Sequence, residues 1–249
     1  MKTYFATPYR EKTNVINNQV QLVAEHDLIK SLMKVVQGLF AVLNDKRQFV
    51  AINTNLFNHL GINNSADLFG MRLGETLNCK YSDVMEGGCG TSAYCSTCGA
   101  AIAMVSALKN KTSAQQTCSI RTKGNGMSKN IFFNVKSSCF QINGKDFILI
   151  FLEDITYEQK MNELEQVFFH DIYNKLSGII NGCEILKYQS TENEEIIQII
   201  YDLSYQMVRE IEFQKKLIRE NYESLSSEIE IIILSTIYKE LDRVFANHS

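Results

Sequence analysis

The hydrophobic and polar positions divide the chain into a front half of mixed period and a back half of helical period. Residues 20–37 repeat apolar side chains every three or four positions, which predicts an amphipathic helix. Shorter runs rich in β-branched and aromatic residues predict strands, and an alanine-rich run predicts another helix. The predicted strands are 38–44, 49–55, 115–122, 130–142 and 146–156, and the second helix is 100–110. The expected fold class of the front half is therefore α+β.

After Thr156 the apolar positions follow helical spacing through two long segments, 157–189 and 193–222. Their apolar stripes are too large for a single helical hairpin to bury. A homodimer that forms an all-α four-helix bundle is the expected solution. The first stripe contains Phe169, Ile172, Leu176, Ile179, Cys183 and Leu186, and the second contains Ile196, Ile200, Leu203, Met207, Ile211 and Ile218.

Composition and charge narrow the class of protein. Lys and Arg number 25 against 28 Asp and Glu, a net charge of −3, so no strong basic field indicates a nucleic-acid partner. The longest apolar runs are too short to cross a bilayer, and the first residues lack the apolar core of a secretion signal. We therefore expect a cytoplasmic protein with no membrane insertion and no nucleic-acid partner.

A histidine, an acid and an amide stand together on the predicted helix 157–189. His170 faces away from the apolar stripe, Asp171 is next to it, and Asn174 lies one turn further on the same face. An exposed imidazole flanked by a carboxylate and an amide can accept a phosphoryl group. The carboxylate would orient or deprotonate the ring, and the amide could position a water for hydrolysis. From helix geometry alone, an ordinary surface histidine is the favoured interpretation.

Seven cysteines in a chain without an export signal indicate reduced thiols, metal ligation or redox chemistry. Cys79, Cys89, Cys95 and Cys98 stand as C-x9-C-x5-C-x2-C in the glycine-rich segment 71–99. Four sulfurs suit tetrahedral zinc and would equally suit an iron–sulfur cluster, and we favour zinc. A dithiol redox switch at Cys95 and Cys98, or four unrelated thiols, remain as alternatives.

The other three cysteines have a simpler interpretation. Cys118 and Cys139 fall in predicted strands, and Cys183 falls on the stripe of a predicted helix. All three are therefore expected to be small core residues.

The run HDIYNKL, which holds His170, Asp171 and Asn174, resembles the H-box of two-component sensor histidine kinases. That family carries the box on the first helix of a dimerisation and phosphotransfer hairpin. The resemblance implies that His170 is the phosphoacceptor, that Asp171 is the activating acid and that Asn174 supports phosphatase activity. It also implies a response regulator receiver domain as partner. Lys175 stands where many members have proline, which departs from the family pattern.

The front half resembles a PAS sensory domain in its order of strands and helices, in GLFAVLNDKRQFVAINTNLFNHLGI and in FILIFLEDITYEQK. The cysteine-rich segment resembles an insertion of the form GCG…C..CG in some bacterial PAS-containing kinases. The expected parts are an N-terminal segment 1–19, a PAS domain 20–156 with the insertion 71–99, a signalling helix with the dimerisation and phosphotransfer hairpin 157–223, and a remnant of the start of an ATP-binding domain 224–249.

Together these resemblances imply the sensory and phosphoacceptor portion of a cytoplasmic sensor histidine kinase. ATP would act only through a domain that we expect to be absent from this chain, so the chain alone is not expected to autophosphorylate. The alternative is a non-catalytic PAS dimerisation or interaction protein with a metal- or redox-sensing cysteine cluster.

Overall fold

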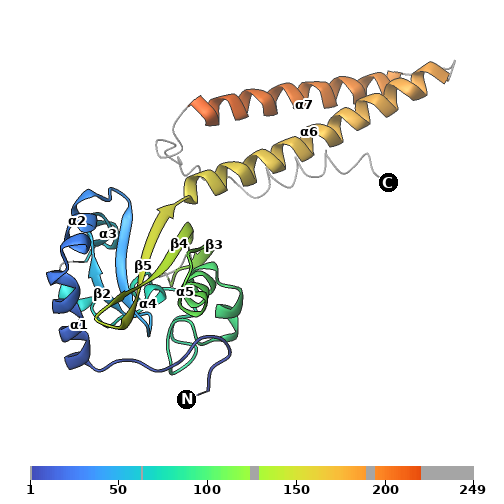
Figure 1. Cartoon of the computed structure of the whole chain (residues 1–249). Helices are drawn as coiled ribbons and strands as arrows, with labels where there is room; N and C mark the ends of the chain where they lie inside the picture. The colour runs from blue at the N-terminus through green and yellow to red at the C-terminus, as the bar shows by residue number, and fades with distance from the viewer. Residues whose placement is uncertain (1, 63, 124–128, 189–193, 220–249) are drawn as a thin grey trace, which may run out of the picture. The chain divides into compact units, whose positions relative to one another are not determined.

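The computed structural model describes residues 2–62, 64–123, 129–188 and 194–219 (Figure 1). The chain divides into two compact units, residues 1–162 and 163–249, called unit 1 and unit 2 below. The expected remnant of an ATP-binding domain, 224–249, lies outside the described residues.

Unit 1 is built on a five-stranded antiparallel sheet with the order β2-β1-β5-β4-β3 (Figure 1). All five predicted strands are found, each displaced by no more than a few residues, so the predicted α+β class is confirmed for this unit. The strands are β1 Leu39–Asn44, β2 Phe49–Ile52, β3 Ala114–Arg121, β4 Asn130–Ile142 and β5 Lys145–Asp154. The helices that follow β2 are α3 Thr54–Leu60, α4 Leu73–Thr76 and α5 Gly99–Asn110, with short 3-10 helices at Ser65–Asp67 and Ala93–Thr97.

The two faces of the sheet bury different residues because side chains alternate along a strand. On β5, Ile148, Ile150 and Leu152 enter the main core, together with residues of α3, α4 and α5. Phe147 on the same strand enters a smaller core, shared with Val23 and Ile29, on the opposite face. Helix α5 packs over β3 and β4 on the main-core face, which brings the cysteine-rich segment against the sheet.

The first predicted helix, 20–37, is wrong in its bounds and continuity. The structure has two helices, α1 Thr13–Glu25 and α2 Asp27–Val35, separated at His26 in an extended conformation. Val23 and Ile29 are both buried, but they stand six residues apart, a spacing that does not share one face of a continuous helix. Breaking the helix at His26 lets both side chains reach the sheet. Helix α1 also begins inside the predicted N-terminal segment 1–19.

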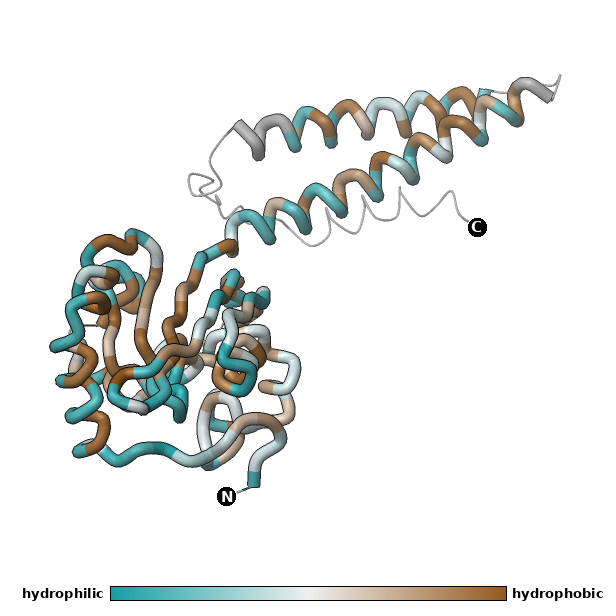
Figure 2. Tube along the Cα trace, in the orientation of Figure 1, coloured by the Kyte–Doolittle hydropathy of each residue, from teal (hydrophilic) through white to brown (hydrophobic). Residues whose placement is uncertain are grey.

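The described part of unit 2 consists of two long helices, and the first of them begins in the last residues of unit 1. Helix α6 spans Thr156–Tyr188 and α7 spans Glu194–Arg219, and Figure 2 shows hydrophobic and hydrophilic residues alternating along both. Gly178 and Gly182 of α6 give close contact with α7, because an added Cβ would stand 2.9 Å from Leu203 and 2.8 Å from Ile200. No described helix is long and apolar enough to cross a membrane.

Candidate functional site

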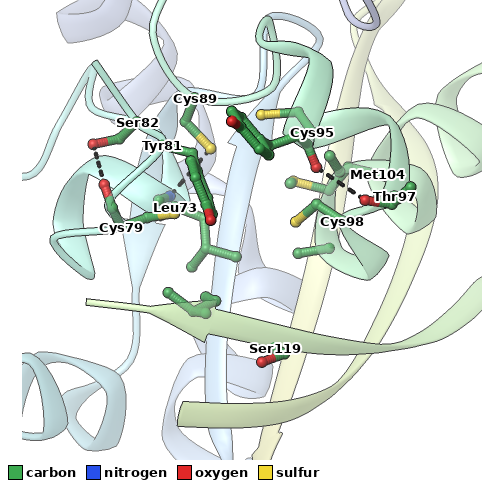
Figure 3. A pocket seen from close by; sticks show the side chains of 15 residues that line it. Leu73, Cys79, Tyr81, Ser82, Cys89, Cys95, Thr97, Cys98, Met104 and Ser119 are labelled. Carbon is green, nitrogen blue, oxygen red and sulfur yellow. Dashed lines mark hydrogen bonds between the residues drawn. The ribbon is translucent and has the colours of Figure 1, made fainter. Parts of the chain in front are cut away.

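The four cysteines predicted as metal ligands line one cavity of unit 1, with a volume of about 310 Å³ (Figure 3). Cys79 and Cys89 come from the loop after α4. Cys95 lies in the 3-10 helix Ala93–Thr97, and Cys98 is the residue immediately before α5. Three successive segments of the chain thus converge on one cavity, which the sequence spacing alone could not establish.

Backbone N–H groups, one from α4 and one from the loop that follows it, contact two of the sulfurs. The Gly74 N–H donates to Cys89 Sγ over 3.3 Å, and the Gly90 N–H donates to Cys95 Sγ over 3.3 Å. An added Cβ on Gly74 would stand 2.7 Å from Cys89 Sγ and 3.3 Å from the Cβ of Cys79, so glycine permits both cysteines to approach α4. N–H groups directed at a sulfur favour its thiolate form.

The protonation of the cysteines differs across the cavity. Burial raises the pKa of Cys89 to about 12 and also raises the pKa of Cys79. Behind another part of the cavity lining, the sulfurs of Cys98 and of Cys118 in β3 share a hydrogen bond over 3.6 Å. This contact lowers the pKa of Cys98 to about 6 and raises that of Cys118. Burial therefore disfavours the thiolate forms of Cys79 and Cys89, and a bound cation would oppose this effect.

Two buried arginines lie beside Cys89 and Cys95. Arg47 and Arg72 are 2% and 1% exposed. Burial lowers the pKa of both, that of Arg72 to about 10. Arg72 donates hydrogen bonds to the carbonyl groups of Thr7, Tyr9, Lys46, Gly87 and Cys89. The Arg72 side chain thereby ties the N-terminal segment and the β1–β2 turn to the cysteine loop.

Neither arginine has a carboxylate partner among the residues that the structure describes. Glu75 pairs with Arg10, and among the described residues no carboxylate forms an ion pair with Arg47 or Arg72. Burial has the largest effect on the pKa of Arg47 and lowers it, whereas Glu75 and the thiolate forms of Cys89 and Cys95 would raise it. Because a buried charge is costly without a counter-charge, a bound group of net negative charge beside Arg47 and Arg72 would offset the cost of burying them.

Replacing Arg72 with methionine is expected to destabilise unit 1 by more than about 3 kcal/mol, because several buried carbonyl groups lose a charged donor at once. Urea unfolding followed by near-ultraviolet circular dichroism measures the change. Arg121, which is exposed on β3, provides the matched control, and Arg121→Met should change the midpoint little. Equal midpoints for the two variants would show that the Arg72 contacts do not stabilise the loop.

The cavity has the donors that a metal site needs, although its side chains are not gathered around one point. Within the described part of the chain, no three histidine, cysteine, aspartate or glutamate side chains are placed to hold one ion. Metal binding would therefore require the cysteines to rotate toward the centre of the cavity. Zinc and iron–sulfur clusters both bind thiolates, so the donor set fits either group.

The second candidate site is on α6. His170 Nδ1 lies 3.2 Å from Asp171 Oδ1 and 3.3 Å from Asn174 Nδ2. The histidine side chain is 74% exposed. The predicted group of three therefore stands together on the surface of the helix. An imidazole whose Nδ1 proton is accepted by a carboxylate presents its Nε2 lone pair to an approaching electrophile.

Comparisons with known proteins bear on the fold alone. No protein-family model matches the chain, and no curated protein matches it. Several solved structures are similar to it. They include PAS domains.

A PAS domain from a two-component sensor histidine kinase is 11% identical over 53% of this chain and 96% of that chain, with a TM-score of 0.34. The PAS domain of nitrogen regulation protein NR(II) from Vibrio parahaemolyticus is 11% identical over 52% and 100%, with a TM-score of 0.36. The LOV protein of Rhodobacter sphaeroides is 7% identical over 80% and 98%, with a TM-score of 0.38.

The structure adds residues that the sequence analysis missed. Cys118 is fully buried, as predicted for a core residue, but its contact with Cys98 was not expected. Cys139 of β4 is half-buried, and its sulfur lies beside Lys111, the residue that follows α5. Cys183 is exposed on α6. The prediction that these two are core residues is therefore wrong for Cys183 and only partly right for Cys139.

Proposed function

We propose that this chain is the sensory and phosphoacceptor portion of a two-component sensor histidine kinase. His170 takes a phosphoryl group and passes it to an aspartate on a response regulator. The observation that carries the proposal is the arrangement of His170, Asp171 and Asn174 on one exposed face of α6. Unit 1, whose fold is similar to PAS domains, is then the sensory part.

The three side chains have distinct roles in this proposal. Asp171 accepts the Nδ1 proton and orients the ring, so that Nε2 attacks the phosphorus atom. Asn174 lies 3.5 Å from Nε2 through its amide nitrogen, close enough to position a water beside the phosphorylated ring in the hydrolytic step. The high exposure of His170 leaves room for a receiver domain to approach.

A second copy of the chain is the expected partner of the helical hairpin. Phe169, Tyr173, Leu176 and Ile180 form an exposed stripe along α6, at alternating spacings of four and three residues. Helix α7 carries a similar exposed stripe, made of Ile197, Tyr201, Val208 and Ile211. Heptad-like stripes left uncovered on both helices favour a dimeric four-helix bundle. A monomer in sedimentation equilibrium would contradict this part of the proposal.

We further propose that Cys79, Cys89, Cys95 and Cys98 bind zinc or an iron–sulfur cluster. A divalent metal ion held by four thiolates carries a net charge of −2, which would neutralise the two buried arginines, Arg47 and Arg72. A four-iron cluster in its common oxidised state, held by four thiolates, has the same net charge. Metal analysis of protein purified without oxygen tests the assignment. Protein without bound metal or cluster would contradict it.

A second candidate function is a PAS-type dimer that senses through its cysteines and acts on a partner without phosphoryl transfer. The cysteine cavity in unit 1 favours it, because that cavity is formed without any residue of the hairpin. The two functions differ in whether His170 carries phosphate.

Transfer from a phosphorylated receiver domain tests the first function without requiring ATP. The full chain is mixed with each response regulator of the same organism, phosphorylated on its aspartate by acetyl phosphate. The expected result is phosphate on His170, stable to alkali and labile to acid, located by mass spectrometry. Phosphate on no residue of the chain, with every receiver tested, would contradict the phosphoacceptor role and leave the sensing dimer.

A further inference from the structure

A fifth cysteine stands beside the cavity on a different element. The sulfur of Cys118 lies 3.6 Å from that of Cys98, although the two residues are twenty positions apart in the chain. Cys98 lines the cavity, whereas Cys118 is completely buried. The two thiols therefore differ in access to a reagent that enters the cavity.

The backbone holds these two residues together. Cys118 sits inside β3, paired with Phe133 of β4, and Cys98 directly precedes α5. An added Cβ on Gly99 would stand 2.1 Å from the carbonyl oxygen of Thr117, so the start of α5 rests directly on β3. Neither thiol lies on a free loop end, and a disulfide bond of about 2.0 Å requires the two sulfurs, now 3.6 Å apart, to move together.

We propose that Cys98 and Cys118 are a redox-active pair that forms an intramolecular disulfide when a low-molecular-weight disulfide such as oxidised glutathione enters the cavity. This pair differs from Cys95 and Cys98, the pair that the sequence spacing indicates. In the structure, Cys95 Sγ contacts Gly90 N–H and Ser92 Oγ instead.

The exchange proceeds in two steps. The Cys98 thiolate attacks one sulfur of oxidised glutathione, which breaks that disulfide, forms a mixed disulfide at Cys98 and releases one glutathione thiolate. The Cys118 thiol then loses its proton, and its sulfur attacks Cys98 Sγ and releases the second glutathione. One glutathione disulfide is reduced to two thiols, which take the two protons, while Cys98 and Cys118 are oxidised to one disulfide.

The consequence for metal binding rests on the proposed function of the cavity. Cys98 cannot hold a metal ion as a thiolate while it is part of a disulfide. Oxidation of the pair and occupancy by metal are therefore mutually exclusive, and oxidation should release the metal. The disulfide itself forms in metal-free protein and does not depend on the metal assignment.

Peptide mapping of the full chain tests the pair directly. Protein stripped of metal by a chelator is treated with oxidised glutathione, quenched with acid, alkylated and digested with trypsin. Cys89, Cys95 and Cys98 share the tryptic peptide 81–109, whereas Cys118 lies in 112–121. A Cys98–Cys118 disulfide therefore joins two peptides, and fragmentation identifies which cysteine of the first peptide is bonded. A disulfide within peptide 81–109 would overturn the proposal.

Variants add a kinetic readout. Cys118→Ser should stop at the mixed disulfide, so that glutathione remains on Cys98, whereas Cys139→Ser should form the internal disulfide as the wild type does. Cys118→Ala is the alternative if a serine hydroxyl is not accepted at this buried position. The folded Cys118 variant could instead lose all of its bound glutathione by forming another internal disulfide. That result would show that Cys118 is not the thiol that displaces glutathione from Cys98. Retention of metal by the oxidised wild type would contradict only the exclusion between disulfide and metal.

Discussion

Replacing His170 with glutamine is expected to abolish phosphoryl acceptance completely, while the protein keeps its fold and its oligomeric state. Glutamine has no nitrogen lone pair that can attack phosphorus, and the side chain at this position is 74% exposed, so the substitution disturbs little packing. Receiver-dependent labelling of the chain measures the loss, and circular dichroism with sedimentation checks the fold and the assembly.

The neighbours of His170 should show smaller and different effects. Asp171→Asn should slow labelling by about 10²–10⁴-fold, because the Nδ1 proton loses its charged acceptor. Asn174→Ala should leave labelling largely intact and slow the loss of phosphate from the labelled chain. His59, which lies against the ring of Phe133 in unit 1, provides the matched control. Equal labelling of His170→Gln and the wild type would remove His170 as the acceptor, and a loss in His59→Gln alone would move the site there.

The site on α6 could be predicted from the sequence because its geometry is local. Residues one and four positions apart on a helix are neighbours whatever the rest of the chain does, so His170, Asp171 and Asn174 needed only a correct helix prediction. The strands of unit 1 were predicted for a similar reason, since each carries its own alternating or apolar pattern. The break at His26 was missed because it depends on how two short helices meet the sheet.

The surroundings of the cysteines could be predicted only in part. The spacing of Cys79, Cys89, Cys95 and Cys98 indicated a common site, and the structure places all four on one cavity wall or another. The contact of Cys118 with Cys98 depends on where β3 lies against the start of α5, which is a tertiary property without a local pattern. The burial of Arg47 and Arg72 was missed because charged residues are ordinarily exposed.

Replacing Cys89 with serine is expected to remove the proposed metal from unit 1. The loss of affinity should be greater than the roughly 10- to 100-fold loss that follows when a residue that contacts a metal ligand, but not the metal, is replaced. Serine cannot supply a thiolate, and the cavity then offers three sulfurs instead of four. Protein purified without oxygen is analysed for zinc and iron, and its visible spectrum separates the two, since only an iron–sulfur cluster absorbs there. Cys139→Ser is the matched control, because Cys139 does not line the cavity.

The buried arginines allow a second and independent test of the proposed metal site. Arg47→Met removes one positive charge from beside Cys89 and Cys95 and should weaken metal binding by about 10- to 100-fold, measured by competition with a coloured chelator. Arg47 donates a hydrogen bond to the Thr7 carbonyl, so the unfolding midpoint is measured alongside to separate lost stability from lost affinity. Weaker binding with an unchanged midpoint would assign the effect to charge. Unchanged metal affinity in a folded Arg47→Met variant would show that the arginines do not balance the charge of a four-thiolate site. For the cysteine variants, equal metal content in Cys89→Ser and Cys139→Ser would place the metal elsewhere.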